Sequence, residues 1–196
     1  MTSKTRQIWH QTYTGVVFDI ESPTSDMVRL VDIAHALSMQ CRYNGHCNSF
    51  YSVAEHSATM VEILAREGHP REVLRAALMH DAAEAYVGDI LSPLKRLLPG
   101  LKAIEGRIER VIAERFGLLY PWPEAVKAAD LRMLRTEADQ IMNAPPRPWT
   151  IEIAQIEAYE GVDLLCDEPL QAYMRFMSAS EALGFGVPVI MPATQL

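Results

Sequence analysis

The segment 74–84 constrains the fold more than any other part of the sequence, because it places His80, Asp81 and Glu84 among mostly apolar neighbours. An α-helix turns by about 100° per residue, so His80 and Glu84 would lie about 40° apart, and Asp81 and Glu84 about 60° apart. Burying three such side chains costs on the order of several kcal/mol unless they are paired or bind a metal. The pattern therefore indicates either a hydrogen-bonded cluster on a helix surface or part of a metal site.

Two further polar residues stand in apolar segments with helical spacing: His56 within 52–58 and Asp130 within 126–131. Taken alone, such a histidine is more often a hydrogen-bonded core residue, and such an aspartate is more often an exposed one. Imidazole nitrogens together with carboxylate oxygens suit a divalent ion such as Mn²⁺, Co²⁺ or Zn²⁺ and can leave positions open for water. Taken jointly with the first segment, these residues indicate a metal site.

The remaining pattern predicts a short β-hairpin followed by helices. Segments 8–13 and 16–20 are rich in β-branched and aromatic residues, and Thr14-Gly15 is expected to form a two-residue turn between them. Helical periodicity then begins near a cap at Thr24 or Ser25 and continues to Leu37. Glycine and proline positions delimit the other predicted helices, at about 52–67, 70–87, 102–116, 124–142 and 169–183.

Composition limits the classes of protein to consider. The 196 residues are 49% apolar and 22% charged, which is typical of one globular domain. The net charge of −7 disfavours a polynucleotide partner. No apolar stretch approaches the roughly 20 residues of a membrane span, and no signal-peptide core is visible at the start. We therefore expect no membrane partner. Three cysteines without framework spacing favour reduced thiols, so we expect a cytoplasmic protein.

The order His56, His80-Asp81, Asp130 resembles the pattern of the HD-domain metal-dependent phosphohydrolase superfamily. The resemblance covers roughly residues 26 to 180. Segments 50–57, 79–86 and 88–95 look like the branch with bacterial 5′-deoxynucleotidases, phage deoxynucleoside triphosphohydrolases and related prophage proteins. The resemblance implies an all-α fold, namely a single HD-domain helical bundle over 1–196. Within it we expect a hairpin at about 8–20, a helical core at about 24–184 and a short C-terminal tail.

The resemblance also implies roles for individual residues. One divalent metal ion (Mn²⁺, Co²⁺, Zn²⁺, Mg²⁺ or Fe²⁺) would be bound by His56, His80, Asp81 and Asp130. A single ion is favoured because all six histidines lie at or before position 80, whereas binuclear members use histidines between the doublet and the last aspartate. The implied catalytic residues are Glu84, Arg42 and Asp89, and the implied substrate-binding residues are Arg42, Tyr43, Asp89, Ile90, Leu91, Ser92, Lys95 and Lys127.

The predicted function is hydrolysis of phosphate from (deoxy)nucleoside 5′-phosphates by attack of metal-bound water on phosphorus. Whether the substrate is a monophosphate or a triphosphate stays open at this point. Two alternatives also stay open: hydrolysis of a signalling nucleotide, such as guanosine tetraphosphate or a cyclic nucleotide, and nucleotide binding without turnover by a regulator. The expected partners are a small nucleotide and, by the resemblance, further copies of the chain in a homo-oligomer.

Overall fold

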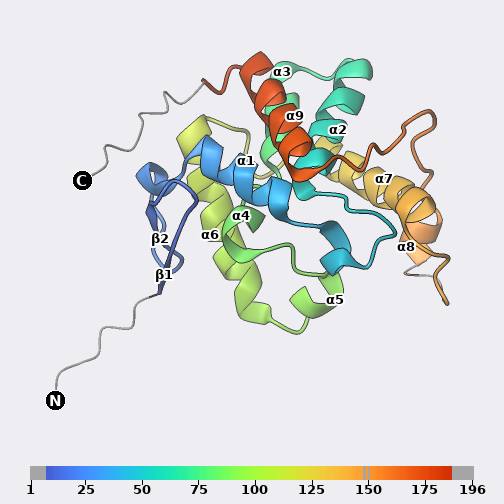
Figure 1. The fold of residues 1–196 in the computed structure, drawn as a ribbon, viewed down its shortest axis with the longest axis horizontal. Helices are drawn as coiled ribbons and strands as arrows, with labels where there is room; N and C mark the ends of the chain where they lie inside the picture. Colours follow the sequence, from blue (N-terminus) through green and yellow to red (C-terminus); the bar gives the residue numbers. More distant parts are fainter. Residues whose placement is uncertain (1–7, 148, 150, 187–196) are drawn as a thin grey trace.

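A short antiparallel hairpin begins the described part of the chain, which comprises residues 8–147, 149 and 151–186 of a computed structural model. Strand β1 (Trp9–Gln11) pairs with β2 (Val17–Asp19), as Figure 1 shows at one end of the molecule. The inward-facing Phe18 is fully buried and stacks on Tyr86, with ring centroids 3.8 Å apart. The hairpin therefore covers one end of the helical core.

The predicted two-residue turn at Thr14-Gly15 is wrong. The connection between the strands is longer, because Thr12 N donates to Val16 O and Gly15 N donates to Thr12 O. Gly15 adopts a φ of +82°, a left-handed conformation that glycine reaches without steric cost. Buried Asp32 decides this geometry, since it accepts hydrogen bonds from the Thr12 hydroxyl (2.9 Å) and from the backbone N of Thr14 (2.6 Å).

Helices follow the hairpin, which confirms the predicted all-α fold class. The C-terminal tail, residues 187–196, lies outside the described residues, and the single-domain assignment stays a prediction. The helices are the short 3₁₀ turns η1 (Ser25–Met27) and η2 (Arg42–Gly45), together with α1 (Leu30–Met39), α2 (Val53–Arg66), α3 (Arg71–Met79), α4 (Glu84–Val87), α5 (Ser92–Lys95), α6 (Pro99–Phe116), α7 (Glu124–Ile141), α8 (Ile151–Ala154) and α9 (Pro169–Ala182).

The first predicted helix is divided into η1 and α1. Val28 and Arg29 are extended between the two pieces, which differs from the continuous helix that the periodicity predicts. The extended backbone lets Val28 bury its side chain completely, while Arg29 Nη1 donates to the Thr14 hydroxyl over 3.0 Å. Contacts with the core and the hairpin thus override the local helical preference.

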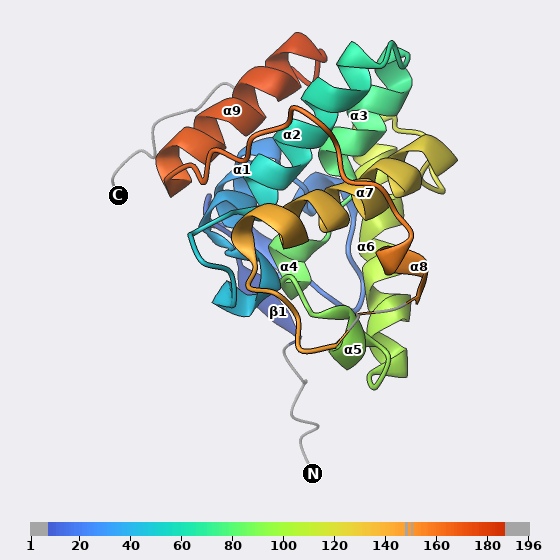
Figure 2. The same cartoon turned by 90° about the vertical axis from the view of Figure 1, so that its right-hand side faces the viewer.

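Helix α2 is the centre of the molecule, in contact with α1, α3, α7 and α9 (Figures 1 and 2). The Ser52 hydroxyl caps it by accepting from Glu55 N over 3.1 Å, and Gly68 follows its end with a φ of +81°. Neighbouring helices cover α2 so completely that even its polar residues Glu55 and His56 have no exposed surface. A polar side chain at such a position needs a partner inside the protein.

The predicted helix 70–87 is interrupted, and the prediction of one continuous helix there is wrong. Helix α3 ends at Met79 and α4 begins at Glu84. Between them Ala82 N donates to Met79 O and Glu84 N donates to Asp81 O, the i to i+3 pattern of a 3₁₀ turn. Side chains three residues apart eclipse one another in such a turn. Asp81 and Glu84 are therefore brought closer in direction than an α-helix would allow.

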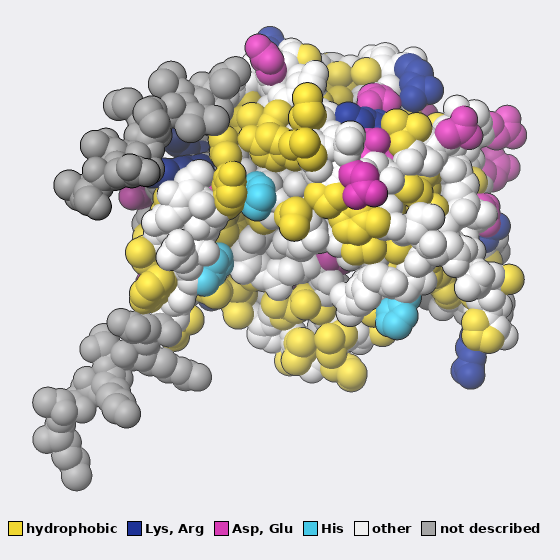
Figure 3. Space-filling view, in the orientation of Figure 1, with side chains coloured by type: hydrophobic (Ala, Val, Ile, Leu, Met, Phe, Trp, Pro, Cys, Tyr) yellow, Lys and Arg dark blue, Asp and Glu magenta, His cyan; other side chains and the backbone are white. Residues whose placement is uncertain are grey.

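Basic side chains are scattered over the face drawn in Figure 3. Among the side chains coloured there, Lys and Arg lie separately rather than in one continuous basic area. This agrees with the net charge of −7.

Within the described residues, every helix is too short or too polar to cross a membrane.

We expect Asp32→Ala to destabilise the protein by about 1–3 kcal/mol, because it leaves the buried Thr12 hydroxyl and the partly buried Thr14 N–H without an acceptor. Asp32→Asn keeps one accepting oxygen and should cost less. Urea unfolding followed by circular dichroism measures both effects. Equal stability of Asp32→Ala and the wild type would contradict the anchoring of the hairpin by Asp32.

Candidate metal centre and adjoining pocket

Four side chains from three parts of the chain converge in the core. His56 comes from α2, His80 and Asp81 follow α3, and Asp130 lies on α7. The Nε2 atoms of His56 and His80 are 3.4 Å apart. Asp81 Oδ2 lies 3.7 and 3.2 Å from these two nitrogens, and Asp130 Oδ1 lies 3.3 and 3.8 Å from them. These are the four residues that the sequence predicts as metal ligands.

The hydrogen bonds of the imidazole rings assign their protons. His80 Nδ1 lies 2.8 Å from Ala77 O, and a carbonyl oxygen only accepts, so Nδ1 carries the hydrogen. His56 Nδ1 likewise donates to Glu137 Oε1 over 2.6 Å. Both Nε2 lone pairs then point into the space that the two carboxylates share. Two facing lone pairs beside two carboxylates require a cation between them. His56, His80 and Asp130 lie close enough together to hold a divalent metal ion, and Asp81 lies beside them.

The electrostatics of the cluster favour positive charge at this point. Burial lowers the pKa of His80, but Asp81 and Asp130 outweigh it and hold that pKa well above its usual range. Burial raises the pKa of Asp130, yet its hydrogen bonds to His56 and His80 hold it well below its usual value. Without a metal, protons on the imidazoles would supply the positive charge. A divalent ion would replace those protons.

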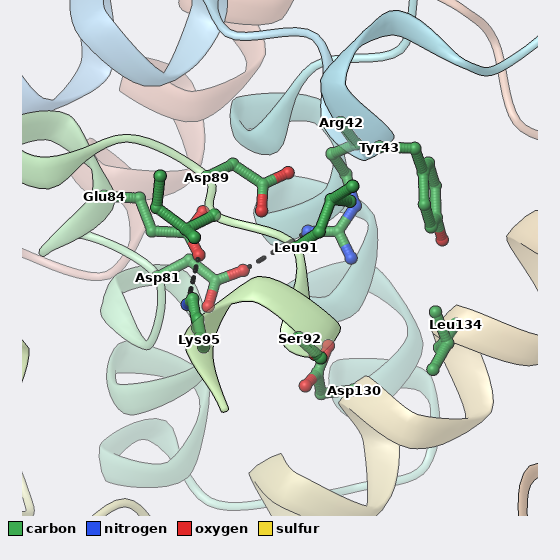
Figure 4. Close-up of a pocket in the computed structure, with 11 residues that line it drawn as sticks. Arg42, Tyr43, Asp81, Glu84, Asp89, Leu91, Ser92, Lys95, Asp130 and Leu134 are labelled. Atoms are coloured by element: carbon green, nitrogen blue, oxygen red, sulfur yellow. Dashed lines mark hydrogen bonds and ion pairs between the residues drawn. The ribbon is translucent and has the colours of Figure 1, made fainter. Parts of the chain in front are cut away.

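A pocket opens beside this cluster (Figure 4). Its lining combines acidic, basic and apolar side chains from η2, α7 and the segment 81–95, and Figure 4 shows Glu84, Asp89 and Lys95 around the same space. The lining residues are Arg42, Tyr43, Asp81, Glu84, Asp89, Ile90, Leu91, Ser92, Lys95, Asp130 and Leu134. With one exception, Lys127, every substrate-binding residue predicted from the sequence lies in this set.

Glu84 is the carboxylate of the pocket with an unsatisfied oxygen. Its Oε1 lies 3.5 Å from Lys95 Nζ, whereas its Oε2 is buried without a hydrogen-bond partner among the described residues. Burial raises the pKa of Glu84 well above its usual range, and the nearby Asp81 and Asp89 add to this effect. A buried, poorly solvated carboxyl group of this kind is suited to exchanging a proton with a bound molecule.

Arg42 is held between two carboxylates. Its Nη1 lies 3.4 Å from Asp81 Oδ2, and its Nε donates to Glu137 Oε2 over 3.2 Å. The backbone N of Arg42 donates to Tyr51 O over 2.9 Å, which ties η2 to the start of α2. The next residue, Tyr43, has a φ of +58° and its hydroxyl donates to Glu137 Oε2. Such a strained backbone position is often found at functional sites.

Gln40, at the end of α1, holds the segment 84–89 that forms one wall of the pocket. Its Nε2 donates to the backbone O of Glu84 over 3.1 Å, and its Oε1 accepts from Asp89 N over 3.1 Å. Gly88, with a φ of +83°, turns the chain sharply between these two bonds. The loop that carries Ile90, Leu91 and Ser92 is therefore fastened to the end of α1.

Lys127 is the predicted substrate-binding residue that the structure does not bring to the pocket. Its side chain is 55% exposed on α7, and its Nζ lies 3.5 Å from Glu124 Oε2. The sequence reasoning also missed Gln40 and Glu137. Glu137 follows Asp130 by seven residues, which is two helical turns, so the spacing could have placed both on one face of α7.

Comparison with known proteins identifies a matching family and two similar proteins. The family model described as 5′-deoxynucleotidase YfbR-like matches residues 38–143, which include the four convergent side chains. The protein named uncharacterized protein YfdR of Escherichia coli (strain K12) is 39% identical over 167 residues, covering 85% of this chain and 90% of that protein. An uncharacterized protein of Rhodobacter capsulatus is 37% identical over 145 residues, covering 69% of this chain and 74% of that protein.

We expect Mn²⁺ or Co²⁺ to raise the thermal unfolding temperature of the wild type, since an ion at 100 times its Kd stabilises the folded state by about 2.7 kcal/mol. His80→Ala and Asp130→Ala should abolish this rise. His35→Ala is the matched control, because His35 stacks on Tyr13, away from the cluster. Differential scanning fluorimetry with and without metal makes the measurement. The same metal-induced rise in all four proteins would rule the centre out.

Proposed function

Because the chain belongs to the YfbR-like 5′-deoxynucleotidase family of the HD-domain superfamily, we propose that it hydrolyses phosphate from (deoxy)nucleoside 5′-phosphates. The observation that carries the proposal is the cluster of His56, His80, Asp81 and Asp130 next to a pocket with a free carboxylate oxygen. These four residues would hold one divalent ion, which would act as a Lewis acid toward water and phosphate oxygens.

Glu84 is the general base in this proposal. Its Oε2, which has no hydrogen-bond partner in the described part of the chain, can accept a proton from the attacking water, and its raised pKa strengthens it as a base toward that proton. Lys95, which pairs with both Glu84 (3.5 Å) and Glu105 (3.0 Å), keeps the carboxylate in place. Proton transfer at Glu84 and positioning of the phosphate are then separate tasks of neighbouring side chains.

Arg42 and Lys95 bind the phosphate oxygens. Arg42 offers a planar set of donors whose direction Asp81 and Glu137 determine, and Lys95 offers a point charge on the other side of the pocket. Tyr43 and the loop 89–92, with Asp89 at its start and Ile90, Leu91 and Ser92 after it, would contact the sugar and base.

We favour a monophosphate over a triphosphate as the substrate. Among the described lining residues, Arg42 and Lys95 supply the positive charge, and Lys127 lies outside the lining. Of the four carboxylates in the same lining, Asp81 and Asp130 would hold the ion, and Glu84 and Asp89 would remain opposite Arg42 and Lys95. The side chains therefore leave no surplus of positive charge for the additional charges of a triphosphate. The homo-oligomer, the cytoplasmic location and the identity of the ion stay predictions.

The test is incubation with Mn²⁺ or Co²⁺ and a panel of ribo- and deoxynucleoside 5′-mono- and triphosphates, with guanosine tetraphosphate and a cyclic nucleotide included. Release of orthophosphate from monophosphates supports the proposal. Tripolyphosphate from triphosphates, or hydrolysis of the signalling nucleotides alone, would contradict the substrate assignment. Binding of nucleotide without any hydrolysis would identify a regulator instead.

Replacement of Glu84 separates metal binding from turnover. We expect Glu84→Gln to lower kcat by about 10²–10⁴-fold, because the amide cannot take up the proton. The affinity for Mn²⁺ should stay close to that of the wild type. Glu105→Gln is the control, since Glu105 binds the same Lys95 but does not line the pocket. Steady-state kinetics and metal titration measure both; full activity of Glu84→Gln would remove Glu84 from the mechanism.

A further inference from the structure

We propose that Glu137 is a positioning residue that orients a metal ligand and the phosphate-binding side chain at the same time. Its two carboxylate oxygens face opposite neighbours: Oε1 accepts from His56 Nδ1 over 2.6 Å, and Oε2 accepts from Arg42 Nε over 3.2 Å and from the Tyr43 hydroxyl. The part that concerns phosphate rests on the function proposed above. The part that concerns the metal rests on the geometry of the cluster.

Glu137 belongs to the core rather than to the pocket. The side chain has no exposed surface and does not line the pocket, so it does not touch the substrate. Its partners come from α2 and η2, while Glu137 itself lies on α7 two turns after Asp130. One buried carboxylate therefore joins three segments that meet at the site. Removing it would leave buried donors on His56, Arg42 and Tyr43 without an acceptor.

The chemistry of a carboxylate is essential to this arrangement. Both of its oxygens accept hydrogen bonds, as the imidazole on one side and the guanidinium and phenol on the other require. With Nδ1 of His56 bound as a donor, the Nε2 lone pair points to the cluster, where His80 Nε2 lies 3.4 Å away. An acceptor behind a ligand histidine orients the ring and makes it more basic toward the metal.

A glutamine at position 137 has nearly the same shape but cannot serve both sides. If its amide oxygen faced His56, its NH₂ group would meet the Arg42 Nε hydrogen and the Tyr43 hydroxyl. If the amide were turned round, its NH₂ group would face His56 Nδ1 and favour the tautomer with hydrogen on Nε2. That tautomer directs a hydrogen, not a lone pair, toward the metal. Glu137→Gln thus leaves one side without its acceptor whichever way it is turned, and in both orientations His56 loses the carboxylate charge that makes its ring more basic toward the metal.

Arg42 is the side chain through which Glu137 affects phosphate binding in the pocket. Its guanidinium lies between Glu137 and Asp81, with Nε on the first (3.2 Å) and Nη1 on the second (3.4 Å). Because Arg42 is only 9% exposed, these two carboxylates determine where its remaining donors point. A shift of Glu137 therefore changes the direction of Arg42 and the lone pair of His56 together.

The experiment compares three variants by metal affinity and by kinetics. Glu137→Gln should weaken the affinity for Mn²⁺ by about 10–100-fold, the usual effect of losing the acceptor behind a ligand histidine, and should also raise KM. Tyr43→Phe removes one donor to Oε2 and leaves the bond to His56, so it should raise KM while changing the metal affinity by less than about threefold. Asp139→Asn is the control, since Asp139 lies on α7 but pairs with exposed Arg135.

A folded Glu137→Gln protein with the metal affinity of the wild type would overturn the proposal. Equal losses of metal affinity in Glu137→Gln and Tyr43→Phe would also overturn it, because the two oxygens would then not have separate roles. Metal titration needs no substrate. A loss of affinity in Glu137→Gln therefore supports the metal-orienting role even if the wild type hydrolyses no nucleotide.

Nuclear magnetic resonance of the wild type keeps the test independent of variant folding. In protein loaded with diamagnetic Zn²⁺ and labelled with ¹⁵N-histidine, we expect His56 to carry its hydrogen on Nδ1, with that proton shifted downfield by the short bond to Glu137. A His56 Nδ1 proton that lacks this downfield shift and exchanges rapidly with water would show that Glu137 does not hold the ring, and would overturn the proposal.

Discussion

Two imidazole nitrogens 3.4 Å apart, with carboxylate oxygens of Asp81 and Asp130 beside them, can share the core only around positive charge. This requirement organises the centre of the molecule. It joins α2, α7 and the turn after α3. A cation at this point lets buried charged groups stabilise the fold, whereas the same groups without one would repel.

The convergent cluster is held rigidly because His56 lies on α2, the helix that the neighbouring helices cover. Helix α2 contacts α1, α3, α7 and α9, and His56 on it has no exposed surface. Side chains in such packed surroundings keep one rotamer, and Glu137 further restricts the His56 ring through a 2.6 Å hydrogen bond. The pocket beside the cluster differs, because the loop 89–92 forms part of its lining and is fastened through Asp89 N to the side chain of Gln40.

Local departures from regular helix give the site its shape. The 3₁₀ turn between α3 and α4 aligns Asp81 with Glu84, and η2 holds Tyr43 at a φ of +58° beside Arg42. Both departures cost conformational energy relative to continuous helix. Contacts with buried carboxylates offset that cost.

The sequence by itself determined the fold class and indicated the residues that converge in the core. Helical periodicity, and the glycines and prolines that end helices, depend on local conformational preferences. A histidine or an acidic residue within an apolar segment is visible without coordinates. His56, His80 and Asp130 could be found for that reason, and the hairpin could be located from its β-branched residues. Only the tertiary structure decided how these residues meet. The interruption after Met79, the longer hairpin loop and the exclusion of Lys127 from the pocket all follow from contacts between segments distant in the chain. The position of Glu137 could not be predicted in this way either, because its three hydrogen-bond donors lie on other elements. Their convergence is a property of packing rather than of local sequence.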